Sequence, residues 1–547
     1  MTSTMMDVPL TIDLIVDRAE RWMGDGEVVS RRPDRSLFRT NYRTIAGRAR
    51  RLARALIGAG IRKGDKVATL MWNHAEHLEA YFGIPLAGAV THTLNLRLHP
   101  DEIAYIANDA GDRIAIVDDV LLPLFDKVVA SGGKFERVLV VGNAGDREPP
   151  RVTDRGGPAV GPEPYERFLD SAPDVALPPL AESDGLATCY TSGTTGKPKG
   201  VVYSHRSTML HTLLAALPDS LNLSRADTLL PVVPMFHVNA WGIPYIAAMT
   251  GAKLVFPGPY LDPPSLLELL AGERVTCAAG VPTIWLGIRE AMDAAPDKWK
   301  LMPGLRMIVG GSAAPEQLIR DFDRLGMTLI HAWGMTEMSP IGLVSRVPPQ
   351  LAGADDDTKY RLRAKQGVPP PLVEVCVRNE AGDVPRDDKT SGEVLVRGPC
   401  IAAAYVGGAT PERWTADGFF RTGDVARIDD HGYVQLTDRI ADLIKSGGEW
   451  IASQELENAL MGHPAIREAA VVGVPHPRWS ERPIAVYVLK PGATATADDL
   501  RAHLAAKFPK FWIPDAFELI EAIPRTSAGK FQKNALRDQF RAYFESK

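Results

Sequence analysis

Residues 190–205, YTSGTTGKPKGVVYSH, constrain the fold most. Glycine lets backbone N–H groups converge on an anion, and serine and threonine add hydroxyl donors. In a GxxxxGK[ST] loop the residue after the lysine offers a hydroxyl to Mg²⁺ on a helix, but here it is Pro198, which has neither hydroxyl nor N–H. The flanking runs LATCY and GVVYSH are typical of strands. The segment therefore predicts a polyphosphate-binding connection between two strands.

The size and charge of the chain limit its class. A chain of 547 residues is too long for one hydrophobic core, so two or more domains are expected. The net charge of −5 gives no electrostatic reason to expect nucleic acid as a partner. The four cysteines are far apart and form no CxxC motif, so we expect a reducing, cytoplasmic location without disulfides or zinc. Neither an export signal nor a membrane span is expected.

The pattern of apolar runs predicts an α/β fold. Strand-like runs at 66–72, 113–119 and 137–142 alternate with helical patterns such as 43–60. The runs GEVLVRG and GYVQLTDR, beyond residue 345, are typical of a smaller antiparallel piece. After residue 438 comes a compact α+β unit of about a hundred residues. We therefore predict a large N-terminal domain over residues 1–437, a hinge at 438–441 and a small mobile C-terminal domain over 442–547.

Seven ordered motifs resemble a known family. They are YTSGTTGKPKG (190–200), PMFHVNAW (234–241), GGSAAP (310–315), WGMTE (333–337), GFFRTGD (418–424), DRIADLIKSGGEWI (438–451) and PRTSAGK (524–530). They resemble the adenylate-forming superfamily of acyl-CoA synthetases, luciferases and peptide-synthetase adenylation domains, and most of all its bacterial medium- and long-chain fatty-acyl-CoA synthetases. The resemblance implies an AMP-forming acyl-CoA ligase: an acid and ATP give acyl-AMP and pyrophosphate, and CoA then takes the acyl group and releases AMP. ATP and CoA are co-substrates and Mg²⁺ is the implied cofactor.

The resemblance also implies residues for the first step. Attack of a carboxylate on a polyphosphate needs positive charge and placed donors more than a nucleophilic side chain. Glu337, with Thr194, is the implied magnesium ligand, and Lys530, Glu337, Thr194 and Thr336 are the implied catalytic residues. Many members carry Tyr where this chain has Trp333. The implied ATP and AMP contacts are Thr191, Ser192, Gly193, Thr194, Thr195, Gly196, Lys199, Gly311, Ser312, Ala313, Trp333, Gly334, Met335, Thr336, Asp424 and Arg439.

For the second step the resemblance implies that the small domain rotates about Ala441, where many members have Lys or Asp. Two adjacent glycines would then admit the slim pantetheine chain of CoA. The implied CoA contacts are Lys445, Ser446, Gly447, Gly448, Glu449 and Trp450. The resemblance further suggests a homodimer.

The acid is predicted from the residues of PMFHVN. Peptide-synthetase adenylation domains usually place an Asp there for the substrate ammonium, but this chain has no carboxylate in that run. An amino acid would leave its cation unpaired, so a simple carboxylic acid is favoured, and the resemblance implies that it is a fatty acid. The implied acid contacts are His237, Val238, Trp241, Gly280, Val281, Pro282 and Gly311.

Several alternatives stay open. Trp241 would plug an acyl tunnel as well as gate it, so a ligase for a short or functionalised acid such as 3-methylthiopropionate is a close second. A luciferase-like oxygenase and a non-catalytic nucleotide-binding protein are more distant. In HAEH (74–77) two histidines lie three residues apart on a predicted helix, and we interpret them as packing, not as a metal site.

Overall fold

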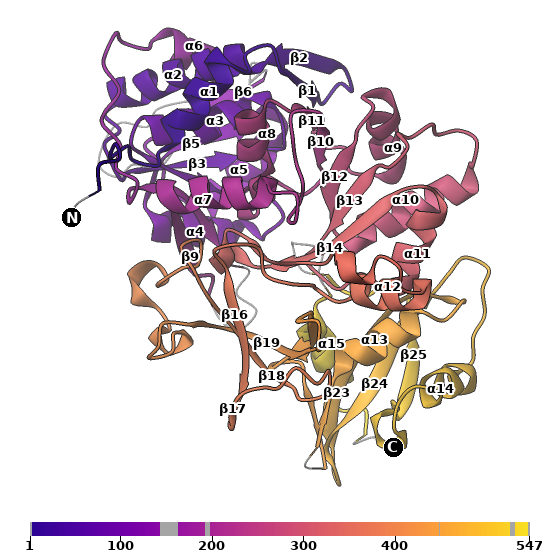
Figure 1. Cartoon of the computed structure of the whole chain (residues 1–547). Helices are drawn as coiled ribbons and strands as arrows, with labels where there is room; N and C mark the ends of the chain where they lie inside the picture. The colour runs from indigo at the N-terminus through magenta and orange to yellow at the C-terminus, as the bar shows by residue number, and fades with distance from the viewer. Residues whose placement is uncertain (1–2, 143–161, 192–196, 448, 526–530, 545–547) are drawn as a thin grey trace.

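The computed structural model describes residues 3–142, 162–191, 197–447, 449–525 and 531–544. Its first sheet has the order β7-β6-β5-β3-β4-β8-β9 and is parallel except for the β8–β9 pair (Figure 1). Its strands are β3 (Lys66–Leu70), β4 (Val90–Thr93), β5 (Asp112–Asp118), β6 (Arg137–Val141), β7 (Glu163–Pro164), β8 (Gly185–Tyr190) and β9 (Gly200–Ser204). The helices between them are α3 (Ala75–Leu86), α4 (Pro100–Ala110), α5 (Leu122–Ala130) and α6 (Tyr165–Asp170), with α2 (Tyr42–Gly58) before β3 and α7 (His205–Ala216) after β9.

The second sheet has the order β15-β14-β13-β12-β10-β11-β1-β2. Its strands are β1 (Glu27–Arg31), β2 (Leu37–Asn41), β10 (Thr228–Pro231), β11 (Lys253–Phe256), β12 (Cys277–Gly280), β13 (Arg306–Val309), β14 (Thr328–Gly334) and β15 (Ile341–Val344). Its helices are α1 (Ile12–Arg21), α8 (Ile243–Thr250), α9 (Pro263–Gly272), α10 (Pro282–Ala294), α11 (Glu316–Arg324) and α12 (Asp356–Ala364). One continuous core joins this sheet to the first, with buried side chains such as Leu52, Leu78 and Leu254.

Two smaller sheets complete the described chain. An antiparallel sheet of order β17-β16-β18-β19-β20 contains β16 (Glu374–Asn379), β17 (Gly382–Asp383), β18 (Gly392–Arg397), β19 (Phe420–Ile428) and β20 (Val434–Arg439). The last sheet, of order β22-β21-β24-β23 with β25 beside β24, contains β21 (Ile444–Ser446), β22 (Glu449–Ile451), β23 (Ile466–His476), β24 (Ser480–Leu489) and β25 (Ala516–Leu519). It carries α13 (Ser453–Met461), α14 (Ala497–Ala505) and α15 (Lys533–Phe540), and in Figure 1 this yellow part lies below α11 and α12.

The secondary-structure predictions can be compared directly with these elements. The strands expected at 66–72, 113–119 and 137–142 are β3, β5 and β6, and the helix expected at 43–60 is α2. The two strands expected around the phosphate loop are β8 and β9, which pair through Tyr190 and Gly200. The expected α/β fold with a smaller antiparallel piece is confirmed. The predicted hinge, 438–441, begins in the last two residues of β20 and ends before β21, where one sheet gives way to the next, although the domain limits themselves stay a prediction.

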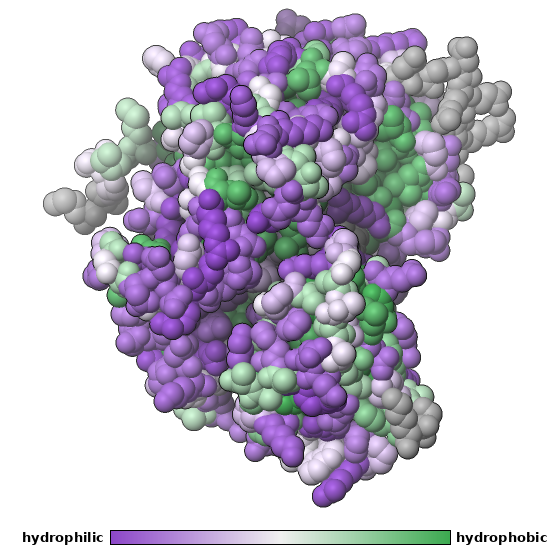
Figure 2. Space-filling view, turned by 90° about the vertical axis from the view of Figure 1, so that its right-hand side faces the viewer, coloured by the Kyte–Doolittle hydropathy of each residue, from purple (hydrophilic) through white to green (hydrophobic). Residues whose placement is uncertain are grey.

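The surface of the molecule and the state of its cysteines can be compared with what the composition predicts. The face shown in Figure 2 is mainly hydrophilic, with apolar side chains gathered in separate patches. Within the described part of the chain, none of the helices combines the length and apolarity needed to cross a bilayer. All four cysteines are free.

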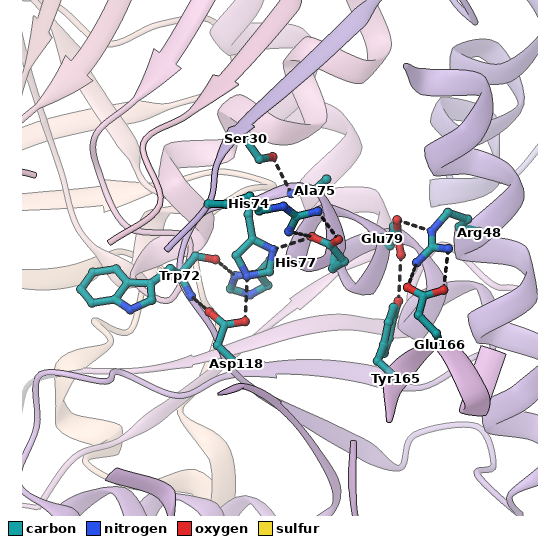
Figure 3. Close-up of polar contacts among 12 residues, drawn as sticks. Ser30, Arg48, Trp72, His74, Ala75, His77, Glu79, Asp118, Tyr165 and Glu166 are labelled. Carbon is teal, nitrogen blue, oxygen red and sulfur yellow. Dashed lines mark hydrogen bonds and ion pairs between the residues drawn. The ribbon is translucent and has the colours of Figure 1, made fainter. Parts of the chain in front are cut away.

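The two histidines of HAEH lie in a buried network of polar side chains (Figure 3). His74 Nε2 is 2.8 Å from Asp118 Oδ1, and its Nδ1 is 3.0 Å from Glu76 Oε2. Arg32 binds both oxygens of Glu76, at 2.7 and 2.8 Å. His77 instead lies 3.0 Å from the hydroxyl of Thr69. Both histidines are buried and hydrogen-bonded to neighbouring protein groups, which is what the packing interpretation expects.

This network predicts a pH-dependent contribution to stability. Burial disfavours the charged form of His74, but Asp118 and Glu76 outweigh burial and raise its pKa from 6.5 to about 10. Since the folded-state pKa lies above the unfolded one, the contribution is complete below about pH 6.5 and is lost as the pH rises through about 10. His74→Ala should lower the free energy of unfolding by about 3–5 kcal/mol at neutral pH, because it leaves two buried carboxylates without this partner. Melting temperatures from pH 7 to 10.5 should show the gap to wild type narrowing, and a constant gap would contradict the assignment.

Candidate active site

Two adjoining cavities lie where the carboxyl ends of β12, β13 and β14 meet the β16–β20 sheet and the C-terminal part. Ligands in α/β proteins commonly bind at this edge of a sheet. The larger cavity has a volume of about 470 Å³, and the smaller, of about 180 Å³, reaches between the N-terminal part and α13. Both are lined by Gly311, Ala332, Trp333, Gly334, Met335, Asp424, Arg439 and Phe531. Residues from four of the predicted motifs therefore meet in one place.

Two of the predicted nucleotide contacts, Trp333 and Arg439, converge on the carboxylate of a third, Asp424. The β19–β20 register pairs Asp424 with Arg439, whose Nε lies 3.3 Å from Asp424 Oδ1. The indole Nε1 of Trp333, at the end of β14, donates to Asp424 Oδ2 at 3.0 Å. Gly342 makes this possible, because a Cβ there would meet the indole at 2.8 Å. Trp333 thus supplies a donor of its own at a position where many members of the resembled family have a tyrosine.

The predicted magnesium ligand Glu337 faces the larger cavity. It lies in a 3₁₀ turn, Thr336–Met338, and its side chain is buried although it lines the cavity. The hydroxyl of Tyr405 donates to Glu337 Oε1, and the hydroxyl of Tyr203 donates to the carbonyl oxygen of Thr336 at 2.7 Å. A hard cation bound to polyphosphate takes one or two protein oxygens, so this single carboxylate fits Mg²⁺.

Tyr405 is a site residue that the sequence did not reveal. It stands in the run AAAYVGG, which has no motif, and reaches Glu337 across 68 positions of the chain. Burial and the Glu337 carboxylate raise the pKa of Tyr405, which keeps its hydroxyl protonated as a donor. The ammonium of Lys199 lies 5.3 Å from the centre of the Tyr405 ring. Tyr405 therefore holds Glu337 and contacts a predicted phosphate-binding lysine.

Removing this hydroxyl gives a testable prediction. In Tyr405→Phe the ring and its contact with Lys199 remain, but Glu337 loses the donor that orients it. We expect the KM for Mg·ATP to rise about tenfold, since a hydrogen bond to a charged group contributes about 1.5 kcal/mol or more. The KM for the acid should stay within about twofold of wild type. Initial rates at varied Mg·ATP would measure this KM. An unchanged KM for Mg·ATP would show that the Tyr405 hydroxyl does not orient Glu337 for Mg·ATP binding.

The ends of the phosphate loop are held together beside the cavity. The backbone N–H of Thr191 donates to the carbonyl oxygen of Lys199 at 2.9 Å, and the N–H of Lys199 donates to Thr191 Oγ1 at 3.3 Å. Both residues line the larger cavity, as does Lys197, whose ammonium lies 5.1 Å from the ring centre of Tyr105. The predicted contacts Ser192, Gly193, Thr194, Thr195 and Gly196 lie outside the described residues.

Most of the predicted acid contacts form one wall of the larger cavity. The lining residues are His237, Val238, Trp241, Val281 and Gly311. Pro282 lines the smaller cavity, with Gly311, Ser312 and Ala313. Gly280 lies behind this wall and not in it, because its α-carbon packs against Trp285, which a Cβ would approach to 2.8 Å.

The predicted CoA segment lies away from both cavities in this arrangement. The hairpin β21–β22 carries Lys445, Ser446, Glu449 and Trp450, and Gly447 lies in its turn, with its N–H donating to the carbonyl oxygen of Trp479 at 2.9 Å. Ser446 Oγ accepts from Arg482 at 3.0 Å, and Gly448 lies outside the described residues. The predicted hinge residue Ala441 lines the larger cavity.

The predicted catalytic lysine, Lys530, also lies outside the described residues. The described residues on either side of its segment are Arg525 and Phe531, which face each other in an antiparallel bridge. Arg525 lines the smaller cavity and Phe531 lines both. The C-terminal part therefore contributes side chains to the same cavities as Trp333 and Asp424.

Comparisons with known proteins show the family of this chain. The family model described as AMP-binding enzyme matches residues 16–406, and that of the AMP-binding enzyme C-terminal domain matches residues 455–530. The chain is 48% identical over 546 residues to a long-chain-fatty-acid–CoA ligase of Thermus thermophilus, covering 99% of this chain and 98% of that protein. It is 41% identical to a 3-methylmercaptopropionyl-CoA ligase of Ruegeria pomeroyi, covering 99% of each.

The fold also matches solved structures. The crystal structure of the anthranilate CoA ligase AuaEII in complex with anthranoyl-AMP superposes with a TM-score of 0.83 at 24% identity, covering 98% of this chain and 99% of that chain. This likeness supports the fold, and the full-length sequence matches support the family. The chain belongs to the AMP-binding, adenylate-forming enzyme family.

Proposed function

We propose that this AMP-forming acid–CoA ligase activates a fatty acid. The observation that carries the proposal is the wall formed by residues 233–241, VPMFHVNAW, which has no Asp or Glu. Val233, Phe236, Val238 and Trp241 line the cavity from this wall beside His237, so the wall offers mainly apolar contact and no carboxylate to pair with an ammonium group. The Thermus relative, named as a long-chain-fatty-acid–CoA ligase, supports the same substrate class.

The adenylation step needs positive charge around the reacting phosphate. A carboxylate oxygen of the acid attacks the α-phosphorus of ATP, the new O–P bond forms and pyrophosphate leaves. We assign Thr194, Lys199 and Thr336 to the phosphates of ATP, and we assign Lys530 to bridge the acid carboxylate and the phosphate. Mg²⁺, held by Glu337, would neutralise part of the phosphate charge. Asp424 and Arg439 would hold the ribose, and Trp333 would stack on the adenine.

The thioester step requires a second arrangement of the small domain. The CoA sulfur attacks the acyl carbonyl carbon, and AMP leaves as the acyl–phosphate bond breaks. The hairpin proposed for CoA lies away from the cavities, so we infer that the small domain rotates about Ala441 to bring Lys445, Gly447 and Glu449 to the acyl group. Two ion pairs that join the parts would then open: Arg427 to Glu455 at 2.7 Å and Arg467 to Glu290 at 3.3 Å.

A panel of acids tests the proposed substrate class. AMP release with ATP, CoA and straight-chain acids of two to sixteen carbons should peak at a medium or long chain. A maximum with 3-methylthiopropionate would favour the second candidate, which the Ruegeria relative supports by its name. Consumption of O₂ when acyl-adenylate is supplied would indicate a luciferase-like oxygenase. Nucleotide binding without AMP release would indicate a non-catalytic protein. The proposal further includes a cytoplasmic homodimer, for which sedimentation is the test.

A further inference from the structure

The wall of the acid cavity contains a left-handed turn. Val238, Asn239, Ala240 and Trp241 have φ angles of 47°, 51°, 48° and 58°, and Gly242 follows at 75°. L-residues disfavour this region because Cβ approaches the following carbonyl oxygen, and the β-branched Val and the bulky Trp are the least suited to it. Consecutive strained residues persist where the surrounding structure holds them, and such strain clusters at functional sites.

A buried asparagine holds the segment that leads into this turn. Asn73, just after β3, is 3% exposed. Its Nδ2 donates to the carbonyl oxygens of Pro231 and Val233, at 3.0 and 2.9 Å, and its Oδ1 accepts from the N–H of Met235 at 2.7 Å. One side chain thus makes three hydrogen bonds to the backbone at the end of β10 and just beyond it.

A second buried group holds the turn itself. The hydroxyl of Tyr81, in α3, lies against the carbonyl oxygen of Met235 and 3.3 Å from Asn239 Oδ1. Cys189 Sγ, in β8, is 3.5 Å from the same Asn239 oxygen. Thr93, the last residue of β4, donates to the carbonyl oxygen of Phe236 at 3.3 Å. Tyr81, Thr93 and Cys189 all belong to the first sheet and its helices. This part of the molecule therefore contacts the turn on the side away from the cavity.

The other side of the turn forms the cavity wall. Val238 and Trp241 line the larger cavity, and the Trp241 indole packs against Gly310, where a Cβ would lie 3.1 Å from its ring. Asn239 points the opposite way and is 4% exposed. A shift of the backbone at Asn239 would therefore move its two cavity-lining neighbours directly.

We propose that Asn73, Tyr81 and Asn239 are positioning residues for the acid site, which hold residues 238–242 in the left-handed turn and so determine which acids the cavity accepts. The inference rests on the proposed function, because it assigns the acid to the wall formed by Val238 and Trp241. None of the three is assigned a contact with the acid, so each acts through the backbone that it binds.

The test compares acid selectivity in two variants and a control. Asn239→Gly keeps a residue that accepts a positive φ but removes the oxygen that faces Tyr81 and Cys189. Tyr81→Phe removes a single hydroxyl. The matched control is Ser345→Ala, which removes another buried hydrogen bond, from Ser345 Oγ to the carbonyl oxygen of Leu362 at 2.9 Å, at a residue that lines neither cavity.

Both site variants should change the ratio of kcat/KM between the best acid and one four carbons shorter by about tenfold or more, the scale of one or two methylene contacts. The KM for ATP should stay within about twofold, and the control should keep the wild-type ratio. In the double variant the change in this ratio, as a free energy, should be less than the sum of the two single changes. Both substitutions remove the contact between the Tyr81 hydroxyl and Asn239 Oδ1. If Asn239→Gly does not fold, Tyr81→Phe decides alone.

Two failures can be told apart. A wild-type protein that activates no acid overturns the proposed function. An active wild type whose site variants keep its acid ratio, or change it no more than Ser345→Ala does, overturns the positioning role.

Discussion

Lys530→Ala should lose acid-dependent exchange of pyrophosphate into ATP by about three orders of magnitude. In a site closed to water one placed positive charge stabilises the developing transition state by several kcal/mol. The thioester step does not need the Lys530 charge beside the phosphate. For that step we propose that the small domain rotates and brings the β21–β22 hairpin to the acyl group. The variant should therefore still convert supplied acyl-adenylate and CoA to acyl-CoA at a rate close to wild type.

The matched control for this prediction is another lysine of the C-terminal part. Lys490, which follows β24, is exposed to solvent and lines neither cavity. Lys490→Ala should keep both half-reactions. If Lys530→Ala keeps full exchange, or loses both half-reactions equally, the assignment of Lys530 to adenylation is wrong.

Glu337→Gln should lower kcat/KM for Mg·ATP by about 10²–10³-fold. The amide is nearly the same size and still accepts from Tyr405, but it lacks the negative charge that favours a hard divalent cation beside phosphate oxygens. The dependence on free Mg²⁺ should also shift to higher concentration. Tyr405→Phe serves as the comparison, because it disturbs the orientation of the same carboxylate without removing its charge.

The outcome of the Glu337 experiment separates a metal role from a structural one. A metal ligand predicts a lower apparent Mg²⁺ affinity with little change in melting temperature. Equal Mg²⁺ dependence in wild type and Glu337→Gln, with a lower melting temperature, would instead make Glu337 a buried structural carboxylate.

The sequence predicted those features that depend on short stretches of chain. Pro198 and the β-rich runs around it predicted a loop between β8 and β9, and the structure confirms the strand pair. The motifs singled out Trp333, Glu337 and Asp424 as site residues, and all three line the larger cavity. For these residues local pattern and family resemblance were sufficient.

Features that depend on contacts between distant segments could not be predicted. Tyr405 reaches Glu337 across 68 positions, and the Trp333 indole reaches Asp424 across 91. The left-handed turn at 238–242 contradicts the intrinsic preference of its residues, so local propensity points away from it. Gly280 was predicted as an acid contact from its place in the chain, but in the structure it packs against Trp285.

In this mechanism the acid becomes a mixed anhydride with AMP before it reacts with CoA. The oxygen atom that the acid contributes to the anhydride can be followed into the products. A fatty acid labelled with oxygen-18 in its carboxyl group should be converted by the purified protein with ATP and CoA, and the nucleotide product analysed by mass spectrometry. One AMP with one labelled oxygen on its phosphate should form for each acyl-CoA. Unlabelled AMP, or ADP with the label in inorganic phosphate, would rule out the acyl-adenylate.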